Sequence, residues 1–138
     1  MTDAPQGPST GLTPHINIRD GRAAEAIDFY TRAFGATEQR RMMADDGKRI
    51  IHAHLHINGA SLMLNDDFPE MRGGGPAPEP QGVVLHLQVD DANTWWNRAT
   101  GAGAEIRFPI QDQFWGDRYG HVGDPFGYTW SIASPIKR

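Results

Sequence analysis

The chain has 138 residues, enough for one domain or for two small fused modules. Its net charge is −4, and no dense lysine and arginine patch offsets it, which argues against nucleic acid as a partner. It has no cysteine, so disulfides, thiolate catalysis and cysteine zinc sites are excluded. No apolar run approaches the length of a membrane span, and residues 1–11 lack the apolar stretch of a signal peptide. We therefore expect a cytoplasmic protein with a flexible tail over residues 1–11 and no membrane partner.

The first half of the chain predicts a strand, a helix and three further strands. Apolar residues recur at helical spacing from Ala23 to Phe34, and Gly35 is well placed to end that helix. Asn58-Gly59 is a strong signal for a hairpin between two strands. Arg40-Arg41, in another strand, is interpreted as a solvated pair. The predicted strands of this half cover residues 12–19, 37–43, 50–57 and 61–65.

Residues 50–57 read Ile-Ile-His-Ala-His-Leu-His-Ile, the most informative run in the chain. Strand side chains alternate between two faces, so the three histidines of this run are predicted to share one face. These histidines are His52, His54 and His56. The opposite, apolar face is predicted to pack against helices and consists of Ile51, Ala53, Leu55 and Ile57.

Two more histidines occur in similar alternating runs, His15 in the first predicted strand and His86 in the second half of the chain. Five of the six histidines are therefore predicted to point to one side of a sheet. Imidazole is the commonest metal ligand and titrates near neutral pH. The pattern thus raises metal binding and proton transfer as candidate functions.

After a loop rich in proline and glycine, the same order of elements recurs. A helix is predicted from Ala92 to Ala99, before Gly101 and Gly103, and residues 124–127 predict a turn between the last two strands. The predicted strands of this half cover residues 83–89, 105–108, 119–123 and 128–133. The chain is thus interpreted as an α+β protein made of two β-α-β-β-β modules. Its predicted parts are the tail 1–11, a first module 12–65, a linker 66–82 and a second module 83–134.

Several distinctive motifs are distributed over both modules. They are Arg19-Asp20, residues 26–30 (Ala-Ile-Asp-Phe-Tyr), 33–36 (Ala-Phe-Gly-Ala), 52–55 (His-Ala-His-Leu), 114–120 (Phe-Trp-Gly-Asp-Arg-Tyr-Gly) and 124–132 (Asp-Pro-Phe-Gly-Tyr-Thr-Trp-Ser-Ile). Together they resemble the vicinal-oxygen-chelate superfamily, which includes glyoxalase I, bleomycin-resistance proteins and extradiol dioxygenases. Within it, the chain is most similar to the PhnB-like branch of small bacterial proteins, over roughly residues 12–133.

The resemblance implies the glyoxalase/bleomycin resistance fold, an open barrel-like sheet around a central cavity. Metal-dependent members place up to four ligands on the inner strands. By resemblance these positions fall near Thr13, His54, Val84 and Ser131. His54 alone is a good ligand among them, and the hydroxyl of Ser131 stands where glyoxalase I has a glutamate. The standard site is therefore largely missing, which argues against a glyoxalase I reaction.

A displaced metal site is one interpretation of the histidines. His15 and His86 lie two residues beyond two of the ligand positions, so both keep the inward face. With His54, or with His52 or His56, they would form a three-histidine set that suits zinc, nickel, manganese or iron. The alternative is that no metal is bound and these imidazoles are partly buried and hydrogen-bonded, lining a polar cavity. Such a face can equally bind an organic anion.

The loop that contains Trp115 and Arg118 is expected to form the rim of this cavity. Trp115 would cover a ligand ring, and Arg118 would pair with a ligand acid group. The structural alternative is that Asp117 and Arg118 hold the loop in place. Trp130 is expected in the core, and His121 either faces inward or bonds the nearby turn.

Three functions remain open at this point. The first is a binding protein that sequesters a small aromatic or polar compound, as bleomycin-resistance members do. Its predicted ligand site consists of His15, His54, His86, Trp115 and Arg118. The second is a metal-dependent lyase, isomerase or dioxygenase in which His52 or His56 acts as the base. The third is a small-molecule sensor or structural partner. The resemblance also implies a homodimer, because members often cover their cavity with a second chain.

Overall fold

The computed structural model describes residues 7–137, so positions 1–6 of the predicted tail and the last residue lie outside the described residues. The chain divides into two compact units between Pro78 and Glu79, with Arg32–Phe34 grouped with the second unit. Each unit is built on its own four-stranded sheet. In the described part of the chain, no helix is long and apolar enough to cross a membrane.

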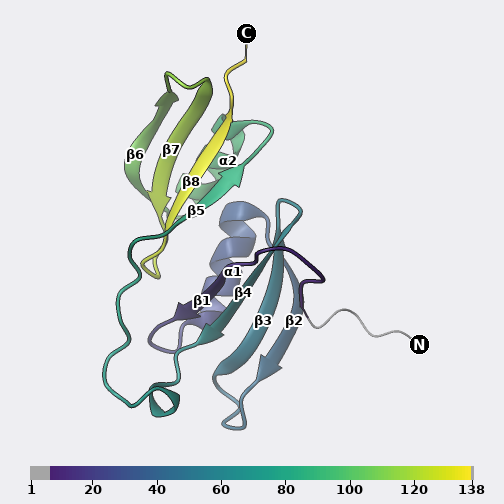
Figure 1. The fold of residues 1–138 in the computed structure, drawn as a ribbon, viewed down its shortest axis with the longest axis vertical. Helices are drawn as coiled ribbons and strands as arrows, with labels where there is room; N and C mark the ends of the chain where they lie inside the picture. Colours follow the sequence, from purple (N-terminus) through teal and green to yellow (C-terminus); the bar gives the residue numbers. More distant parts are fainter. Residues whose placement is uncertain (1–6, 138) are drawn as a thin grey trace, which may run out of the picture. The chain divides into compact units, whose positions relative to one another are not determined.

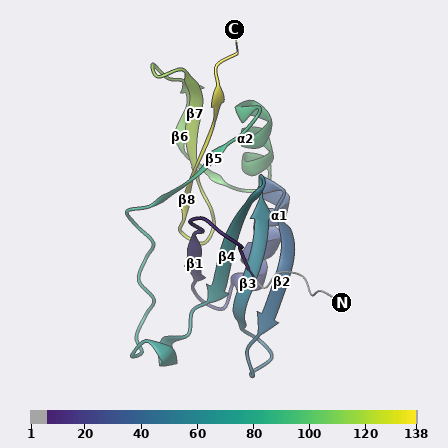
Figure 2. The ribbon, with the colours of Figure 1, turned by 45° about the vertical axis from the view of Figure 1, so that its right-hand side comes forward.

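The first unit contains a sheet with the strand order β1-β4-β3-β2 (Figure 1). β1 runs parallel to β4, and the other neighbouring strands are antiparallel. Both ribbon views show α1 against one face of this sheet (Figures 1 and 2). The elements are β1 (His15–Ile18), α1 (Ala23–Phe34), β2 (Thr37–Met43), β3 (Ile50–Ile57), β4 (Ala60–Asp66) and a 3-10 turn, η1 (Pro69–Met71).

The second unit repeats this arrangement with the strand order β5-β8-β7-β6. Here β5 is parallel to β8, and the other pairs are antiparallel. Both sheets are open, and the predicted α+β fold of two β-α-β-β-β modules is confirmed. The elements are β5 (Val84–Gln88), α2 (Ala92–Gly101), β6 (Glu105–Asp112), β7 (Asp117–Gly123) and β8 (Thr129–Pro135).

The local signals for chain reversal act as predicted. Gly35 ends α1 in the left-handed conformation, with φ 67°, and its amide donates to Thr31 O at 3.1 Å. Asn58 and Gly59 have φ values of 51° and 80° and form the two-residue connection between β3 and β4. The predicted hairpin therefore fixes how β3 and β4 align with each other in the sheet.

Residues at equivalent positions start the two helices. Asp66, at the end of β4, accepts hydrogen bonds from Ala23 N at 2.8 Å and from Ile50 N at 2.7 Å. Ser134, near the end of β8, accepts one from Ala92 N at 2.9 Å. Both acceptors are buried, and each satisfies the first amide of a helix, which has no partner within the helix itself. β4 is thus tied to the start of α1, and β8 is tied to the start of α2.

β3 departs from strict alternation at its start. Met42 pairs with His52 and Met43 pairs with Ile50, so Ile51 lies in an irregularity of the ladder. Ile51 is 51% exposed, whereas Ile50 is 1% exposed. The prediction that Ile51 lies on the buried apolar face is therefore wrong. The extra residue of a bulge shifts the alternation of side chains, so Ile50 is buried in its place. The other predicted apolar positions, Ala53, Leu55 and Ile57, are buried.

The core of the second unit is built around its buried tryptophans. Trp130 is buried as predicted, and its Nε1 donates to Asp124 Oδ2 at 2.9 Å. Trp96 of α2 packs over β7 at Gly120, where a Cβ would come within 2.7 Å of Trp96 Cζ3. Gly120 is therefore a packing requirement of this unit, because a side chain there would overlap the indole.

Candidate functional site

Cross-strand register defines one row of side chains on the face of the first sheet that carries His54. His15 of β1 pairs with Met63 of β4, Met63 pairs with His54 of β3, and His54 pairs with Arg40 of β2. Residues directly opposite in a sheet share a face. We call this row of four the first row. His52 belongs to the same face, since it lies two residues before His54.

His54 is the buried centre of the first row, with 2% of its surface exposed. Its Nε2 lies 2.8 Å from Ser61 Oγ, and its ring centre lies 5.0 Å from that of His56. Burial lowers the pKa of His54, and the nearby His56 and His52 lower it further. The imidazole is therefore kept in the neutral form at neutral pH.

Arg40 joins this row because of a β-bulge. Glu38 pairs with Leu55 and Arg40 pairs with His54, so Gln39 is the extra residue of β2. Without the bulge, Gln39 would lie opposite His54 and Arg40 would lie on the other face. The interpretation of Arg40 as solvated holds only in part, because the residue is half-buried and its Nε is fully buried. No signal in the sequence marks this bulge.

Two buried side-chain nitrogens have no hydrogen-bond partner among residues 7–137, and both belong to the first row. They are Arg40 Nε and His54 Nδ1, which we call the open pair. Buried polar atoms are usually satisfied, because leaving one without a partner costs about 1–3 kcal/mol. The open pair is therefore the strongest indication of a ligand site in the first unit.

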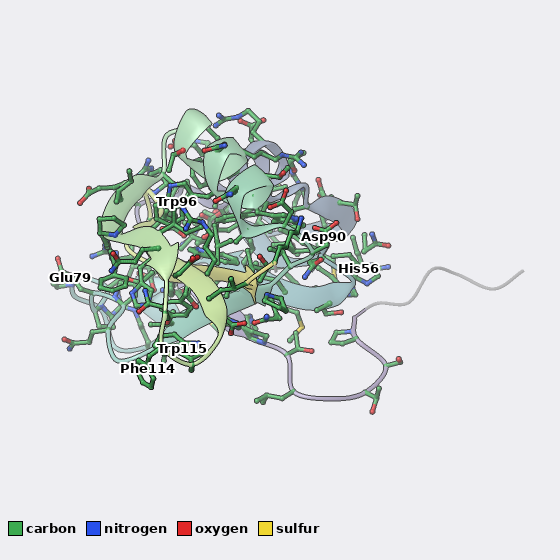
Figure 3. All side chains as sticks on the ribbon, turned by 90° about the horizontal axis from the view of Figure 1, so that it is seen from above. His56, Glu79, Asp90, Trp96, Phe114 and Trp115 are labelled. Carbon is green, nitrogen blue, oxygen red and sulfur yellow. The ribbon has the colours of Figure 1, made fainter. Side chains whose placement is uncertain are left out.

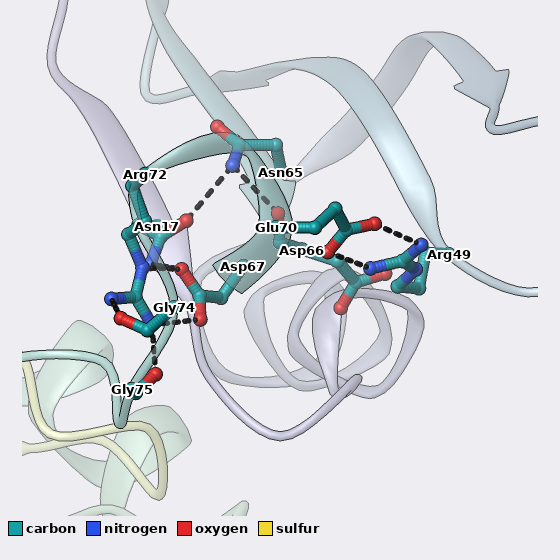
Figure 4. Close-up of polar contacts among 9 residues, drawn as sticks. All are labelled: Asn17, Arg49, Asn65, Asp66, Asp67, Glu70, Arg72, Gly74 and Gly75. Carbon is teal, nitrogen blue, oxygen red and sulfur yellow. Dashed lines mark hydrogen bonds and ion pairs between the residues drawn. The ribbon is translucent and has the colours of Figure 1, made fainter.

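His15, at the end of the first row, is exposed and is hydrogen-bonded to a side-chain amide. Its Nε2 donates to Asn65 Oδ1 at 2.7 Å, because that oxygen can only accept. Asn65 Nδ2 in turn donates to Asn17 Oδ1 at 2.9 Å and to Asp66 O at 2.8 Å (Figure 4). The ring centre of His15 lies 6.3 Å from that of His52. The predicted site residues His15 and His54 thus lie on one face, with Met63 between them.

The loop after β4 is fastened beside this amide network. Asn17 Nδ2 donates to Asp67 Oδ1 at 3.1 Å, and Arg72 pairs with the carboxylate of Asp67 at 2.8 Å. Arg72 also donates to the carbonyl oxygens of Gly74 and Gly75 (Figure 4). Residues of the predicted linker are therefore bound to the end of the first sheet.

The equivalent positions of the second sheet form the second row. His86 of β5 pairs with Ser131 of β8, Ser131 pairs with His121 of β7, and His121 pairs with Phe108 of β6. His86 Nδ1 lies 2.6 Å from Ser131 Oγ, and His86 Nε2 lies 2.8 Å from Gln88 Oε1. Both ring nitrogens of His86 are thus engaged within the sheet.

His121 is also satisfied within the second unit. Its Nε2 is hydrogen-bonded to the Tyr119 hydroxyl at 2.7 Å, and the ring of Tyr119 is stacked 6.0 Å from that of His86. Burial lowers the pKa of His121, and the nearby His86 lowers it further. His121 faces the same side as Ser131 and His86, which resolves the two alternatives left by the sequence.

The predicted rim residues have different surroundings in the second unit. Trp115 is 50% exposed, and its ring lies 5.1 Å from Phe114 and 5.3 Å from Tyr119 (Figure 3). Arg118 Nε donates to Asn93 Oδ1 at 2.7 Å, and Arg118 Nη1 donates to Asp112 Oδ1 at 3.1 Å. These bonds tie β7 to α2 and β6, as the structural alternative for Arg118 expects.

The structure brings the predicted site residues together in two sets. His15, His52, His54 and His56 belong to the first unit, and His86, Trp115 and Arg118 belong to the second. Among residues 7–137 no group of three or more histidine, aspartate or glutamate side chains is arranged to hold a metal ion. The three-histidine set of His15, His54 and His86 stays a prediction.

Comparisons with known proteins agree with this fold. A family model described as Glyoxalase/Bleomycin resistance protein/Dioxygenase superfamily matches residues 13–132. An uncharacterized protein of Mycobacterium bovis is 48% identical over 130 residues, covering 91% of this chain and 84% of the relative. The crystal structure of PA1353 from Pseudomonas aeruginosa has a TM-score of 0.75 at 24% identity, covering 94% of this chain and 100% of that one. TioX from Micromonospora sp. ML1 gives 0.67 at 27% identity, with coverages of 91% and 100%.

Proposed function

Because the chain belongs to the glyoxalase/bleomycin resistance protein/dioxygenase superfamily, we propose that it binds a small organic molecule and sequesters it as resistance proteins do. In each unit, the proposed contact face is the one that carries its own row. The proposed ligand-binding residues are His15, His54, His86, Trp115 and Arg118. This proposal needs no metal, because a neutral imidazole and a guanidinium can hold a ligand by hydrogen bonds.

The open pair is the single observation that carries the proposal. His54 and Arg40 are adjacent in the first row, and each keeps a buried nitrogen without a partner among residues 7–137. A ligand that supplies an acceptor there removes the cost of burying these atoms, so binding is favoured at this position. In the second unit, taken by itself, exposed Trp115 offers an aromatic surface on which a flat ligand can stack.

Several finer features belong to the same proposal. The motif of residues 114–120 supports the PhnB-like branch. A homodimer is proposed because superfamily members commonly pair, and a second chain would cover part of the ligand. A cytoplasmic location is proposed from the composition, which has no cysteine.

A screen by thermal unfolding tests the proposed function. The full chain is scanned against antibiotics and aromatic acids, with and without a chelator. We expect at least one organic compound to raise Tm by about 10 °C near 100 times its Kd, since binding to the native state alone stabilises it. The chelator should not change that shift. A screen in which metal ions stabilise the protein and no organic compound does would contradict the proposal.

A metal-dependent lyase, isomerase or dioxygenase is the second candidate function, with His52 or His56 as the proposed base. The observation that favours it is His54 Nδ1, a potential metal ligand whose ring lies 5.0 Å from His56. The residues fit a metal poorly for two reasons. Hydrogen bonds occupy both ring nitrogens of His86, and the residue opposite His54 in the first row is the cationic Arg40.

Metal content separates the two candidates. Tag-free protein and a His54→Ala variant are incubated with zinc, nickel, manganese or iron(II), dialysed and analysed for bound metal. The enzyme reading requires about one divalent ion per chain that is lost in the variant. We expect no stoichiometric ion in either protein.

A further inference from the structure

The open pair has a specific chemical demand, because one of its members is a permanent cation. Arg40 Nε carries a hydrogen and can only donate, and a guanidinium is a cation with no acceptor atom. A group that satisfies it must therefore present an acceptor. We infer that the first row binds an anionic oxygen, such as the carboxylate of a ligand, between Arg40 Nε and His54 Nδ1. This inference rests on the proposed function and adds the chemical class of the ligand.

The sheet register places the two residues opposite each other on one face. Arg40 and His54 are direct cross-strand partners, and the side chains of such partners are neighbours on one face. The bulge at Gln39 is what brings Arg40 to this face. In contrast, the next residue, Arg41, lies opposite Ala53 on the other face and is paired with Glu38 at 2.7 Å. One arginine of the pair is thus neutralised and the other lies beside His54.

His54 can act as the second donor. Its Nε2 is bonded to Ser61 Oγ, and a hydroxyl can donate or accept by rotation. When Ser61 donates to Nε2, the proton of the neutral imidazole is on Nδ1, so Nδ1 becomes a donor. Arg40 and His54 then present two N–H groups to one oxygen or to the two oxygens of a carboxylate. Hydrogen bonds to an ionised acceptor are roughly twice as strong as neutral ones.

The charges on this face favour an anion over a metal cation. Neutral His54 adds no negative charge, and the guanidinium of Arg40 repels a cation. Within the first row itself there is no carboxylate, since its members are His15, Met63, His54 and Arg40. The nearest acidic residue along β2, Glu38, is already paired with Arg41. A bound anion would therefore meet one positive charge and two N–H donors.

The N-terminal segment crosses this face. Residues 7–14 run across the first sheet on the side away from α1 (Figures 1 and 2). A Cβ placed on Gly7 would lie 4.0 Å from Met63 Sδ, so the segment reaches the first row.

Calorimetric titration of the full chain with benzoate and with benzamide tests this inference. The two probes have similar shapes, but only benzoate carries an anionic oxygen pair. Arg40→Gln removes the proposed donor and its charge, and Arg41→Gln removes the same charge one residue away on the other face. Arg40→Lys keeps the charge without the planar donor. Circular dichroism confirms that each variant is folded.

We expect benzoate to bind the native protein at least about tenfold more tightly than benzamide, since the bond involves a charged group. Arg40→Gln should weaken benzoate binding by about tenfold or more, and Arg40→Lys should weaken it less. Arg41→Gln should change it less than about twofold. Equal binding of benzamide and benzoate would overturn the anion site and leave the proposed function standing. Failure of benzoate to bind, or equal weakening by both glutamine variants, would also overturn it.

Discussion

The first and second rows share one backbone geometry and differ in chemistry. Both sheets have the same strand order, and in both a bulge in the outer strand precedes the last member of the row. In the second row, Ser131 and Gln88 bond to both ring nitrogens of His86, and the Tyr119 hydroxyl bonds to Nε2 of His121. In the first row, the open pair remains. The repeated scaffold therefore fixes where four side chains stand, and the rows differ in chemistry at the second position, Met63 or Ser131, and at the fourth.

That fourth position is Arg40 in the first row and Phe108 in the second. Phe108 lies 5.7 Å from the ring of His121 and continues the aromatic surface that includes Tyr119 and Trp115. Arg40 instead places a positive charge next to a neutral imidazole. On these faces the first unit thus offers hydrogen-bond donors, whereas the second unit offers a flat apolar surface.

The largest expected difference between the units concerns their buried acceptors. Asp66→Ala removes the acceptor of two amides, Ala23 N and Ile50 N, whereas Ser134→Ala removes the acceptor of one, Ala92 N. We expect losses in the free energy of unfolding of about 3 kcal/mol or more for Asp66→Ala and about 1 kcal/mol for Ser134→Ala. Urea denaturation measures both. Equal losses would contradict the stronger role of Asp66.

A second difference concerns the packing of helix on sheet. Gly120 of β7 occupies the position that Ala53 holds in β3, one residue before the row histidine. Gly120→Ala therefore introduces the residue of the first unit, but its Cβ would lie 2.7 Å from Trp96 Cζ3 and 2.8 Å from the Ile110 backbone. We expect a loss of about 1–3 kcal/mol in unfolding free energy.

Gly101→Ala is the matched control for this change. Gly101 is the last residue of α2, and a Cβ there meets no atom within 4 Å. We expect a small gain in unfolding free energy, of about 0.5 kcal/mol, because alanine favours the helix. If Gly120→Ala were as well tolerated as Gly101→Ala, the close approach of Trp96 to β7 would be wrong.

The smallest expected effect is a shared dependence on pH. Burial lowers the pKa of His54 and of His121, so the unfolded chain binds more protons than the native one below the ordinary histidine pKa of about 6.5. Stability is therefore complete above that value and is lost as pH falls through it toward the lowered native pKa values. Urea midpoints at pH 7.5 and pH 5.5 should show this loss. His54→Gln and His121→Gln should each reduce it, and an unchanged loss in both variants would contradict the assignment.

The sequence alone predicts the backbone because its signals are local. The helical spacing over 23–34, the glycine at 35 and the hairpin dipeptide 58–59 each specify their own neighbourhood, and all three are found. The family motifs add the doubled topology. The shared face of His54 and His52 also follows from alternation within one regular stretch of β3.

The features that alternation misses are those that depend on bulges and partners. The bulge at Ile51 exposes a residue expected in the core, and the bulge at Gln39 brings Arg40 beside His54. A bulge depends on how two strands align, and residue spacing in one strand does not specify it. In the same way, the bonds of His86 to Ser131 and Gln88 depend on the register of β5 with β8. Counting the histidines in the sequence therefore overestimates how many imidazole groups are available to bind a metal or a small molecule.

The most direct test of the contrast between the two rows is an NMR titration of both histidines with and without saturating benzoate. Without benzoate, both His54 and His121 should titrate below the ordinary histidine pKa. With benzoate, the pKa of His54 should rise by roughly 1 pH unit, because an adjacent anion stabilises the imidazolium, and that of His121 should stay unchanged. A shift confined to His121, or equal shifts at both, would contradict an anion site in the first row.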